Sequence, residues 1–270
     1  METQFKNFFN NYLKTRFPLP SQPETKLLQK ALLYTLKAPS SLFRPKVAWT
    51  VAQCLGHPPQ DIFPWATAIE LIHGASLIHD DLPCMDNSPQ RRGKSSNHLV
   101  FGEDMALLAG SCLFVEAFSL LTFPIFKERN QEMLELLVRR AGFYGMMGGQ
   151  AMDIRGKSLS QSFLLKLFEL KTGSLILASV EGPALLWNCT KRELKALQKY
   201  GHFLGQAYQA ADDLTDKSFS KPELHKKKTL LKKLTQESIN SLRILKFPTQ
   251  PLAELSLLNE YRALKKPKKS

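Results

Sequence analysis

The sequence predicts an all-α protein, a bundle of about ten helices around a central cavity. Three observations predict this fold class. Apolar residues recur at helical spacing through most of the chain. Alternating strand patterns are scarce, and no Asn-Gly or Asp-Gly pair is present to close a hairpin between two such strands. The chain has 270 residues and is 43% hydrophobic, which suits a single domain over residues 1–270.

The helical spacing appears in eight segments, of which the first is an amphipathic stretch at the N-terminus. In chain order they are residues 1–17, 25–37, 65–79, 104–121, 132–147, 160–180, 191–215 and 237–245. Proline and glycine clusters separate them, among them Gly182-Pro183. Ser21 and Thr190 are each followed three residues later by a glutamate, which predicts a capping box at two helix starts.

The net charge of +13 is unevenly distributed. Residues 217–270 contain 14 lysines and arginines against four glutamates, so the basic surplus lies in the last fifth of the chain. Nucleic-acid binding favours a basic face over a whole domain, and we therefore expect no nucleic-acid partner. Two interpretations fit this region: a solvated basic tail, frayed from about residue 262, or lysines that neutralise phosphates near a site.

Cysteine usage and hydropathy bear on the compartment. The four cysteines are widely spaced and form no Cys-x-x-Cys pair, which argues against a disulfide framework and favours a reducing compartment. We expect no transmembrane segment, because no apolar run approaches the length of about 18 residues that a membrane span requires. The N-terminal stretch lacks the apolar core of a secretory signal. The sequence therefore predicts a soluble intracellular protein of the cytoplasm.

Two aspartate clusters, each at the end of an apolar helical segment, carry the strongest chemical signal. The first is Asp80, Asp81 and Asp86, followed by Arg91-Arg92-Gly93, and the second is Asp212, Asp213 and Asp216. Carboxylates three or four residues apart repel one another on a helix, so such a cluster indicates either solvent exposure or a bound cation. Mg²⁺ takes one or two carboxylates per ion with water and substrate phosphate oxygens. Two such clusters, with paired arginines after the first, favour metal-assisted departure of a diphosphate.

Residues 72–117 resemble the trans-prenyl diphosphate synthases, and look closest to the bacterial and plastid farnesyl and geranylgeranyl diphosphate synthases. The resemblance covers about residues 25–216 and continues in Gly148-Gly149-Gln150-Ala151-Met152-Asp153, Lys171-Thr172-Gly173-Ser174 and Gly205-Gln206-Ala207-Tyr208-Gln209. It implies head-to-tail condensation of isopentenyl diphosphate with dimethylallyl, geranyl or farnesyl diphosphate. It also implies two aspartate motifs that face each other across the cavity, three Mg²⁺ ions, and a homodimer.

The resemblance assigns a role to each matching residue. The metal ligands it implies are Asp80, Asp81, Asp86, Asp212, Asp213 and Asp216. Arg91 matches the arginine that binds the allylic diphosphate, and Arg44, His73 and Arg92 match residues that bind isopentenyl diphosphate. Lys171, Thr172 and Gln209 match catalytic residues beside the allylic diphosphate and cation. Simpler interpretations stay open for some of them: His73 and His79 also fit buried histidines, and Gly148-Gly149 also fits a close helix contact.

In this family, the side chains just before the first motif set the product length. Ser76 and Ala75 lie four and five residues before Asp80, about one helical turn deeper, and both are small. Small residues there leave room for a long product. Leu82–Met85 makes the motif two residues longer than Asp-Asp-x-x-Asp, a feature associated with shorter products. Together these features predict geranylgeranyl diphosphate as the product, with farnesyl diphosphate close behind.

The sequence departs from the family pattern in two places. A family segment Gly-Gly-Lys-Arg-x-Arg-Pro is here Pro39-Ser40-Ser41-Leu42-Phe43-Arg44-Pro45, which retains Arg44 but places Ser41 at the lysine position. Lys37 or Lys46 would have to supply that cation. After Asp216, residues 217–229 are about ten residues shorter than the family's lid segment. Lys226-Lys227-Lys228-Thr229 is the candidate replacement for it.

Because the aspartates, both arginines, Lys171 and Gln209 are all retained, we predict an active prenyltransferase. Two alternatives stay open. One is a non-catalytic or weakened subunit that partners a catalytic homologue. The other is a terpenoid cyclase or head-to-head synthase, which the Arg91-Arg92-Gly93 sequence argues against.

Overall fold

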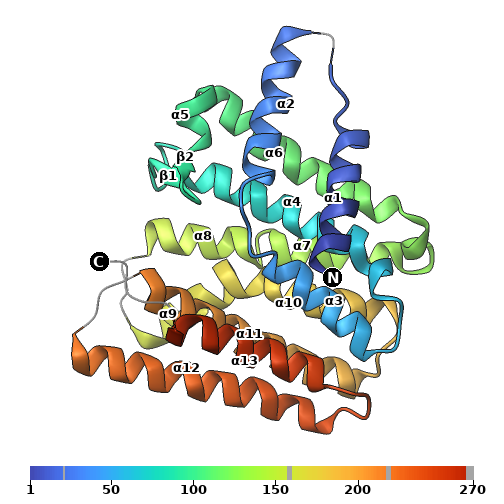
Figure 1. Cartoon of the computed structure of the whole chain (residues 1–270), viewed down its shortest axis with the longest axis vertical. Helices are drawn as coiled ribbons and strands as arrows, with labels where there is room; N and C mark the ends of the chain where they lie inside the picture. Colours follow the sequence, from blue (N-terminus) through green and yellow to red (C-terminus); the bar gives the residue numbers. More distant parts are fainter. Residues whose placement is uncertain (21, 157–159, 217–219, 266–270) are drawn as a thin grey trace. The chain divides into compact units, whose positions relative to one another are not determined.

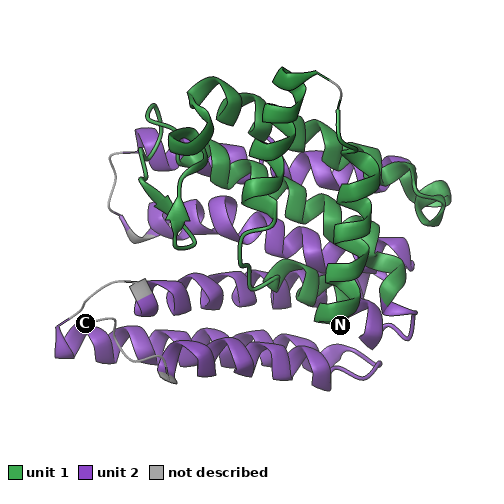
Figure 2. Ribbon diagram, turned by 45° about the horizontal axis from the view of Figure 1, so that its top comes forward, with its two compact units in different colours: residues 1–49, 60–130 green, residues 50–59, 131–270 purple. Residues whose placement is uncertain are grey.

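The computed structural model describes residues 1–20, 22–156, 160–216 and 220–265, without the side chains of Gln161, Asp216 and Lys265. These residues are mostly helical, with one two-stranded hairpin among them, which confirms the all-α prediction (Figure 1). The chain divides into two compact units, coloured separately in Figure 2. Unit 1 is residues 1–49 and 60–130, and unit 2 is residues 50–59 and 131–270. The single-domain description and the facing of the two aspartate motifs stay predictions.

Unit 1 contains the first aspartate motif. Its elements are α1 (Glu2–Arg16), α2 (Pro23–Leu36), the first part of α3 (Phe43–Cys54), most of the 3-10 helix η1 (Pro59–Ile62), α4 (Phe63–Asp80), β1 (Gln90–Arg91), β2 (Lys94–Ser95), α5 (Asn97–Phe101), α6 (Glu103–Ser119), and the 3-10 helices η2 (Leu120–Thr122) and η3 (Pro124–Arg129). The amphipathic N-terminal helix forms as predicted and buries Phe5, Phe9 and Leu13, which are spaced at helical period on one face.

Helix α4 is the buried helix of unit 1, and it carries the first motif at its C-terminal end. Trp65, Ile69 and Ile72 are fully buried, and α4 packs extensively against α6. The ring of His79 lies between the two helices, where its Nε2 is 3.2 Å from the carbonyl oxygen of Leu107. His79 is partly exposed and not fully buried, so the simpler interpretation of this residue as a buried histidine is not confirmed.

Unit 2 contains the second aspartate motif. Its elements are α7 (Asn130–Ala141), α8 (Met146–Arg155), α9 (Gln161–Phe168), the π-helical segment η4 (Glu169–Gly173), α10 (Ser174–Leu186), α11 (Lys191–Asp216), α12 (Lys221–Ser241), η5 (Leu242–Ile244) and α13 (Gln250–Lys265). Helices α11, α12 and α13 lie side by side (Figures 1 and 2). The buried residues of their common core are Ala207, Ala210, Ala211, Leu231 and Ala263. These small side chains let the long helix α11 approach its two neighbours closely.

The capping prediction for α11 is confirmed. The backbone N–H of Glu193 donates to Oγ1 of Thr190 at 3.2 Å, and the backbone N–H of Thr190 donates to Oε2 of Glu193 at 2.9 Å. Helix α2 instead begins at Pro23 with Gln22 at its N-cap. Ser21, the predicted cap of that helix, lies outside the described residues.

Several element boundaries differ from the prediction. The segment predicted as one helix over 132–147 is two helices, because the chain turns through residues 142–145. Pro183 was expected to separate helices but lies inside α10. Helices α3 and α13, the first part of α12 and the hairpin were not predicted. The hairpin has no usual sequence signal, because its turn is Arg92-Gly93 and not one of the pairs that typically form such a turn.

The statement that no segment reaches membrane-span length was wrong for residues Glu103–Thr122. This helical segment has 20 residues, and a window of 18 residues within it has a mean hydropathy of 1.8, so it is long and apolar enough by length and composition to cross a membrane. Of that window, 39% is buried inside the protein, and α6 packs against α4 and α2. A core helix of a soluble protein meets the same criterion.

Candidate active site

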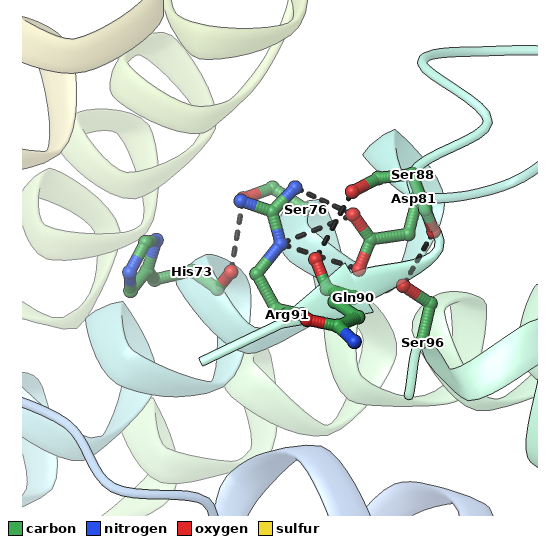
Figure 3. A network of polar contacts seen from close by, with 7 residues as sticks. All are labelled: His73, Ser76, Asp81, Ser88, Gln90, Arg91 and Ser96. Atoms are coloured by element: carbon green, nitrogen blue, oxygen red, sulfur yellow. Dashed lines mark hydrogen bonds and ion pairs between the residues drawn. The ribbon is translucent and has the colours of Figure 1, made fainter. Parts of the chain in front are cut away.

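Asp81 of the first motif is held by Arg91 in unit 1. The Asp81 side chain is 2% exposed. The guanidinium of Arg91 donates to its Oδ1 from Nε at 3.0 Å and from Nη2 at 2.5 Å (Figure 3). Burial lowers the pKa of Arg91, but the hydrogen bond to Asp81 and the charges of Asp81, Asp80 and Asp86 outweigh it and raise that pKa. All three acids of the first motif therefore act on one guanidinium.

The hairpin sends two adjacent arginines to different partners. Arg92 and Gly93 form its turn, with φ of +55° and +76°, the left-handed pair that a type I′ turn requires. Arg91 contacts Asp81, whereas Nη2 of Arg92 donates to Nε2 of His73 at 3.4 Å. A guanidinium only donates, so this nitrogen of His73 is an acceptor. Burial and the charges of Arg44 and Arg92 lower the pKa of His73 well below its usual range, so the ring is neutral.

The left-handed conformation of Arg92 leads to a prediction. A non-glycine residue in this region costs about 1 kcal/mol, and glycine removes that cost. We expect Arg92→Gly to be about 1 kcal/mol more stable than Arg92→Ala, since both lose the same contact to His73. Urea unfolding measures the difference. Both variants should have a raised KM for isopentenyl diphosphate, the substrate that the resemblance assigns to Arg92. An alanine variant as stable as the glycine variant would show that the turn is not strained.

Glu70 completes this part of the site, and the sequence analysis missed it. It is 5% exposed on α4, nearly one turn before His73, and accepts a hydrogen bond of 3.2 Å from the hydroxyl of Ser40. Burial raises the pKa of Glu70, while the charges of Arg44 and Arg92 work in the opposite direction. The structure therefore brings Arg44, His73 and Arg92 together around a buried carboxylate. The available signal was a carboxylate in the middle of the largely apolar segment that precedes the first motif.

Lys46, one candidate for the cation that Ser41 lacks, pairs with an acid of α1. The Nζ of Lys46 lies 3.1 Å from Oε2 of Glu2, so this lysine is engaged by α1. Lys37 borders a surface cavity lined by residues of α1 and α2. Leu42, at the position of a family arginine, is buried. Among the described residues of this segment, Arg44 is the cation close to Glu70 and His73.

The second motif ends α11 in unit 2, and two of its acids contact cations of the same unit. Arg262 of α13 donates from Nη2 to Oδ1 of Asp212 at 2.7 Å. Lys227 of α12 lies with its Nζ 3.5 Å from Oδ2 of Asp213. The side chain of Asp216 lies outside the part of the chain that the structure describes. No sequence signal marked Arg262 as a partner of this motif.

The predicted lid segment begins outside the described residues, which lack 217–219. Lys226-Lys227-Lys228-Thr229 forms part of the regular helix α12. Because Lys227 reaches Asp213, this run does lie next to the second motif. Its role as a lid stays a prediction.

Lys171, Thr172 and Gln209 lie close together in unit 2 and connect to the second motif. Oγ1 of Thr172 donates to Oε1 of Gln209 at 3.0 Å, and Nε2 of Gln209 donates to Oδ1 of Asp213 at 3.3 Å. Lys171 forms an ion pair with Asp153, a residue to which the sequence analysis gave no role. The network therefore joins α8, η4 and α11 around the residues predicted to be catalytic.

The π-helical geometry of η4 places Lys171 and Thr172 at this point. Such segments are rare and frequently occur at functional sites. Helix α8 approaches η4 at Gly149, where a Cβ atom would come within 2.8 Å of the carbonyl carbon of Leu170. Glycine is therefore required for this contact, and the simpler interpretation of Gly149 as a close-packing residue is confirmed.

Both motifs supply carboxylate oxygens, which are the ligands that a hard divalent cation such as Mg²⁺ prefers. Within the described ranges, no three His, Cys, Asp or Glu side chains form a group that could hold a metal ion without other ligands. Mg²⁺ is compatible with this arrangement, because it needs one or two carboxylates per ion and completes its shell with water and phosphate oxygens. The ligands would be Asp80, Asp81 and Asp86 in unit 1 and Asp212, Asp213 and Asp216 in unit 2.

The two residues predicted to set the product length differ in exposure. Ala75 is fully buried in unit 1. Ser76 is partly exposed, and its hydroxyl donates to the carbonyl oxygen of His73 at 2.9 Å, next to Arg91 in Figure 3. Of the two, Ser76 therefore has accessible space beside it.

A helical fold with two aspartate motifs, and adjacent arginines after the first, is the pattern expected of helical prenyltransferases. Comparison with known proteins supports this class. The chain matches the polyprenyl synthetase family model over residues 25–257, and it belongs to that family.

Relatives and solved structures agree with the family. Farnesyl diphosphate synthase of Geobacillus stearothermophilus is 42% identical over 196 residues, which are 70% of this chain and 66% of that enzyme. The small subunit of the heterodimeric geranylgeranyl pyrophosphate synthase of Arabidopsis thaliana chloroplasts is 38% identical over 195 residues, 70% of this chain and 59% of the subunit. The structure of a geranyltransferase from Legionella pneumophila matches with a TM-score of 0.86 and 27% identity, covering 97% of this chain and 94% of that one.

Proposed function

We propose that this chain is a Mg²⁺-dependent short-chain prenyl diphosphate synthase, which condenses isopentenyl diphosphate head to tail with an allylic diphosphate. The observation that carries the proposal is the hairpin. It directs Arg91 to the first aspartate motif and Arg92 to the cluster of Arg44, Glu70 and His73. Two adjacent arginines with separate partners suit two separate diphosphates. The similarity to farnesyl and geranylgeranyl diphosphate synthases supports the same reaction.

Each group of residues has a task in this reaction. Arg91 binds the allylic diphosphate, and Arg44 with Arg92 binds isopentenyl diphosphate. Magnesium, when bound, would neutralise the charge that develops on the leaving diphosphate. The allylic C–O bond breaks, the isopentenyl double bond attacks the allylic carbon, and the departing diphosphate accepts the released proton. Thr172 and Gln209, held together by a hydrogen bond, stabilise the allylic cation with their oxygen atoms.

A direct assay tests the proposal. The purified chain is incubated with Mg²⁺, isopentenyl diphosphate and dimethylallyl, geranyl or farnesyl diphosphate in turn, and the products are separated by chain length. We expect elongation of at least one allylic substrate, and its loss when EDTA removes the metal. No elongation with any of the three would contradict the proposal. Restored activity on addition of a catalytic homologue would then support the alternative of a partner subunit.

A substitution at Ser76 tests the predicted product, geranylgeranyl diphosphate with farnesyl diphosphate second. We expect Ser76→Phe to shorten the product, because the ring fills space about one helical turn, 5.4 Å, beyond the motif. Ala75→Phe should also shorten it, but at a stability cost of about 1–3 kcal/mol, because Ala75 is fully buried. Product chromatography and thermal unfolding measure the two effects. An unchanged product from a folded Ser76→Phe enzyme would exclude Ser76 from the cavity floor.

The chain is proposed to work as a homodimer in the cytoplasm, without a nucleic-acid partner. Helix α6 supports the dimer, because it exposes large apolar side chains on one side while its other side is buried. The exposed residues are Leu107, Leu108, Val115 and Phe118. An exposed apolar stripe on a helix is typical of a protein interface. It also accounts for the high hydropathy of this segment without a membrane.

A further inference from the structure

Arg262 contacts the second aspartate motif from a distant part of unit 2. Its Nη2 donates to Oδ1 of Asp212 at 2.7 Å, and its guanidinium carbon lies 5.0 Å from the ring centroid of Tyr208. Tyr208 precedes Asp212 by four residues on α11, so the ring and the carboxylate reach one guanidinium from the same helix face. Helix α13 therefore brings a positioned cation to a carboxylate that the proposed function assigns to a metal ion.

This ion pair is well oriented but open to exchange. The side chain of Arg262 is 32% exposed and that of Asp212 is 35% exposed. The Nε of Arg262 is buried and has no hydrogen-bond partner among the described residues, so this nitrogen does not reinforce the contact that Nη2 makes with Asp212. Burial lowers the pKa of Arg262, but the nearby Tyr208 and Asp212 outweigh it and raise that pKa. Arg262 therefore stays charged while its contact with Asp212 can open.

We propose that Arg262 is the resident counter-cation of Asp212, which competes with a divalent metal ion for this carboxylate and thereby lowers the metal affinity of the second motif. The inference rests on the proposed function, which makes Asp212 a metal ligand. A guanidinium 2.7 Å from Oδ1 occupies one oxygen of the Asp212 carboxylate and repels a second cation that approaches the other, because like charges at such distances repel strongly. Lys227 restrains Asp213 less, since that pair is 3.5 Å long and the lysine is 38% exposed.

A titration with Mn²⁺ in the absence of substrate tests this role of Arg262. Electron paramagnetic resonance of free Mn²⁺ gives the amount bound, and the site of interest is the part that Asp212→Asn removes. We expect Arg262→Gln to tighten this site about three- to tenfold, the effect of freeing a carboxylate from a partly exposed, charged hydrogen bond. Arg262→Lys retains the charge without the planar guanidinium, and its affinity should lie between the two.

Arg16→Gln is the matched control, because it also removes an arginine from a carboxylate, Glu116 of unit 1, and changes the net charge equally. It should leave Mn²⁺ affinity unchanged. Unchanged or weaker Mn²⁺ binding by Arg262→Gln, with a normal circular dichroism spectrum, would overturn the inference. If that variant does not fold, wild-type affinity in Arg262→Lys overturns it instead.

The Asp212→Asn variant separates this inference from the proposed function. If it binds as much Mn²⁺ as the unchanged chain, Asp212 is not a metal ligand, and both ideas fail at this residue. If Asp212→Asn loses bound Mn²⁺ while Arg262→Gln binds Mn²⁺ with the affinity of the unchanged chain, only the inference about Arg262 fails.

Discussion

Replacement of Asp81 by asparagine is expected to lower kcat/KM for condensation by roughly 10²–10³-fold, the usual effect of removing one preorganised electrostatic group. Asp81 is the buried acid of the first motif and accepts two donors of Arg91. Asparagine removes the charge that would hold a metal ion, and it also removes the anchor of Arg91. The Mg²⁺ concentration for half-maximal rate should rise as well, which steady-state kinetics over a range of Mg²⁺ will measure.

The control for this variant is Asp104→Asn at the exposed start of α6. Asp104 accepts a hydrogen bond from the backbone of Met105, a contact that asparagine can keep. Its activity should match that of the unchanged chain. Because Arg91 is 34% exposed, it can turn to solvent in Asp81→Asn, and we expect a stability loss of only about 1 kcal/mol. An Asp81→Asn enzyme within threefold of normal activity would contradict the role given to the first motif.

The largest effect on stability is expected at Glu181, which is 2% exposed in α10. Its carboxylate accepts two hydrogen bonds of 2.6 Å from Arg140 of α7 and one of 2.7 Å from Gln198 of α11. Glu181→Gln leaves the largely buried Arg140 without a counter-charge, and removing one partner of such a pair costs about 3–5 kcal/mol. We expect Tm to fall by roughly 5–10 °C, measured by calorimetry.

A double variant separates the loss of the ion pair from the cost of leaving one buried charge unpaired. Arg140→Met with Glu181→Met removes both charges, and should recover part of the stability that Glu181→Gln loses. The exposed pair of Lys6 and Glu2 is the reference, since Lys6→Gln should change stability by less than about 1 kcal/mol. A double variant less stable than Glu181→Gln would show that packing around the pair, and not the buried charge, dominates.

Local patterns predicted most of the helices, because helical periodicity reports directly on which face of a segment is buried. Where a prediction failed, a contact or an unusual turn was responsible. Arg92 adopts a left-handed conformation that residue-type preferences do not predict. This conformation forms the turn of the hairpin, from which Arg91 and Arg92 reach different partners. Pro183 is accommodated within α10 although proline usually ends a helix.

The same distinction applies to the residues of the candidate site. Motif residues such as Asp80, Asp81 and Arg91 could be predicted because they lie within a few positions of one another in the sequence. Glu70 could not, because its significance comes from being buried beside Arg44 and Arg92. Asp153 reaches Lys171 only because Gly149 lets α8 approach the π-helical segment.

By itself, the sequence determined the all-α class, the two aspartate motifs, and the resemblance to prenyl diphosphate synthases. These properties follow from periodicity and from residues close together along the chain. The tertiary structure alone decided which cations Asp81, Asp212 and Asp213 contact. Arg262 lies 50 residues after Asp212, and the packing of α13 against α11 brings them together. An arginine from the basic last fifth of the chain thus supplies a partner for the second motif, because charges interact through space and not along the sequence.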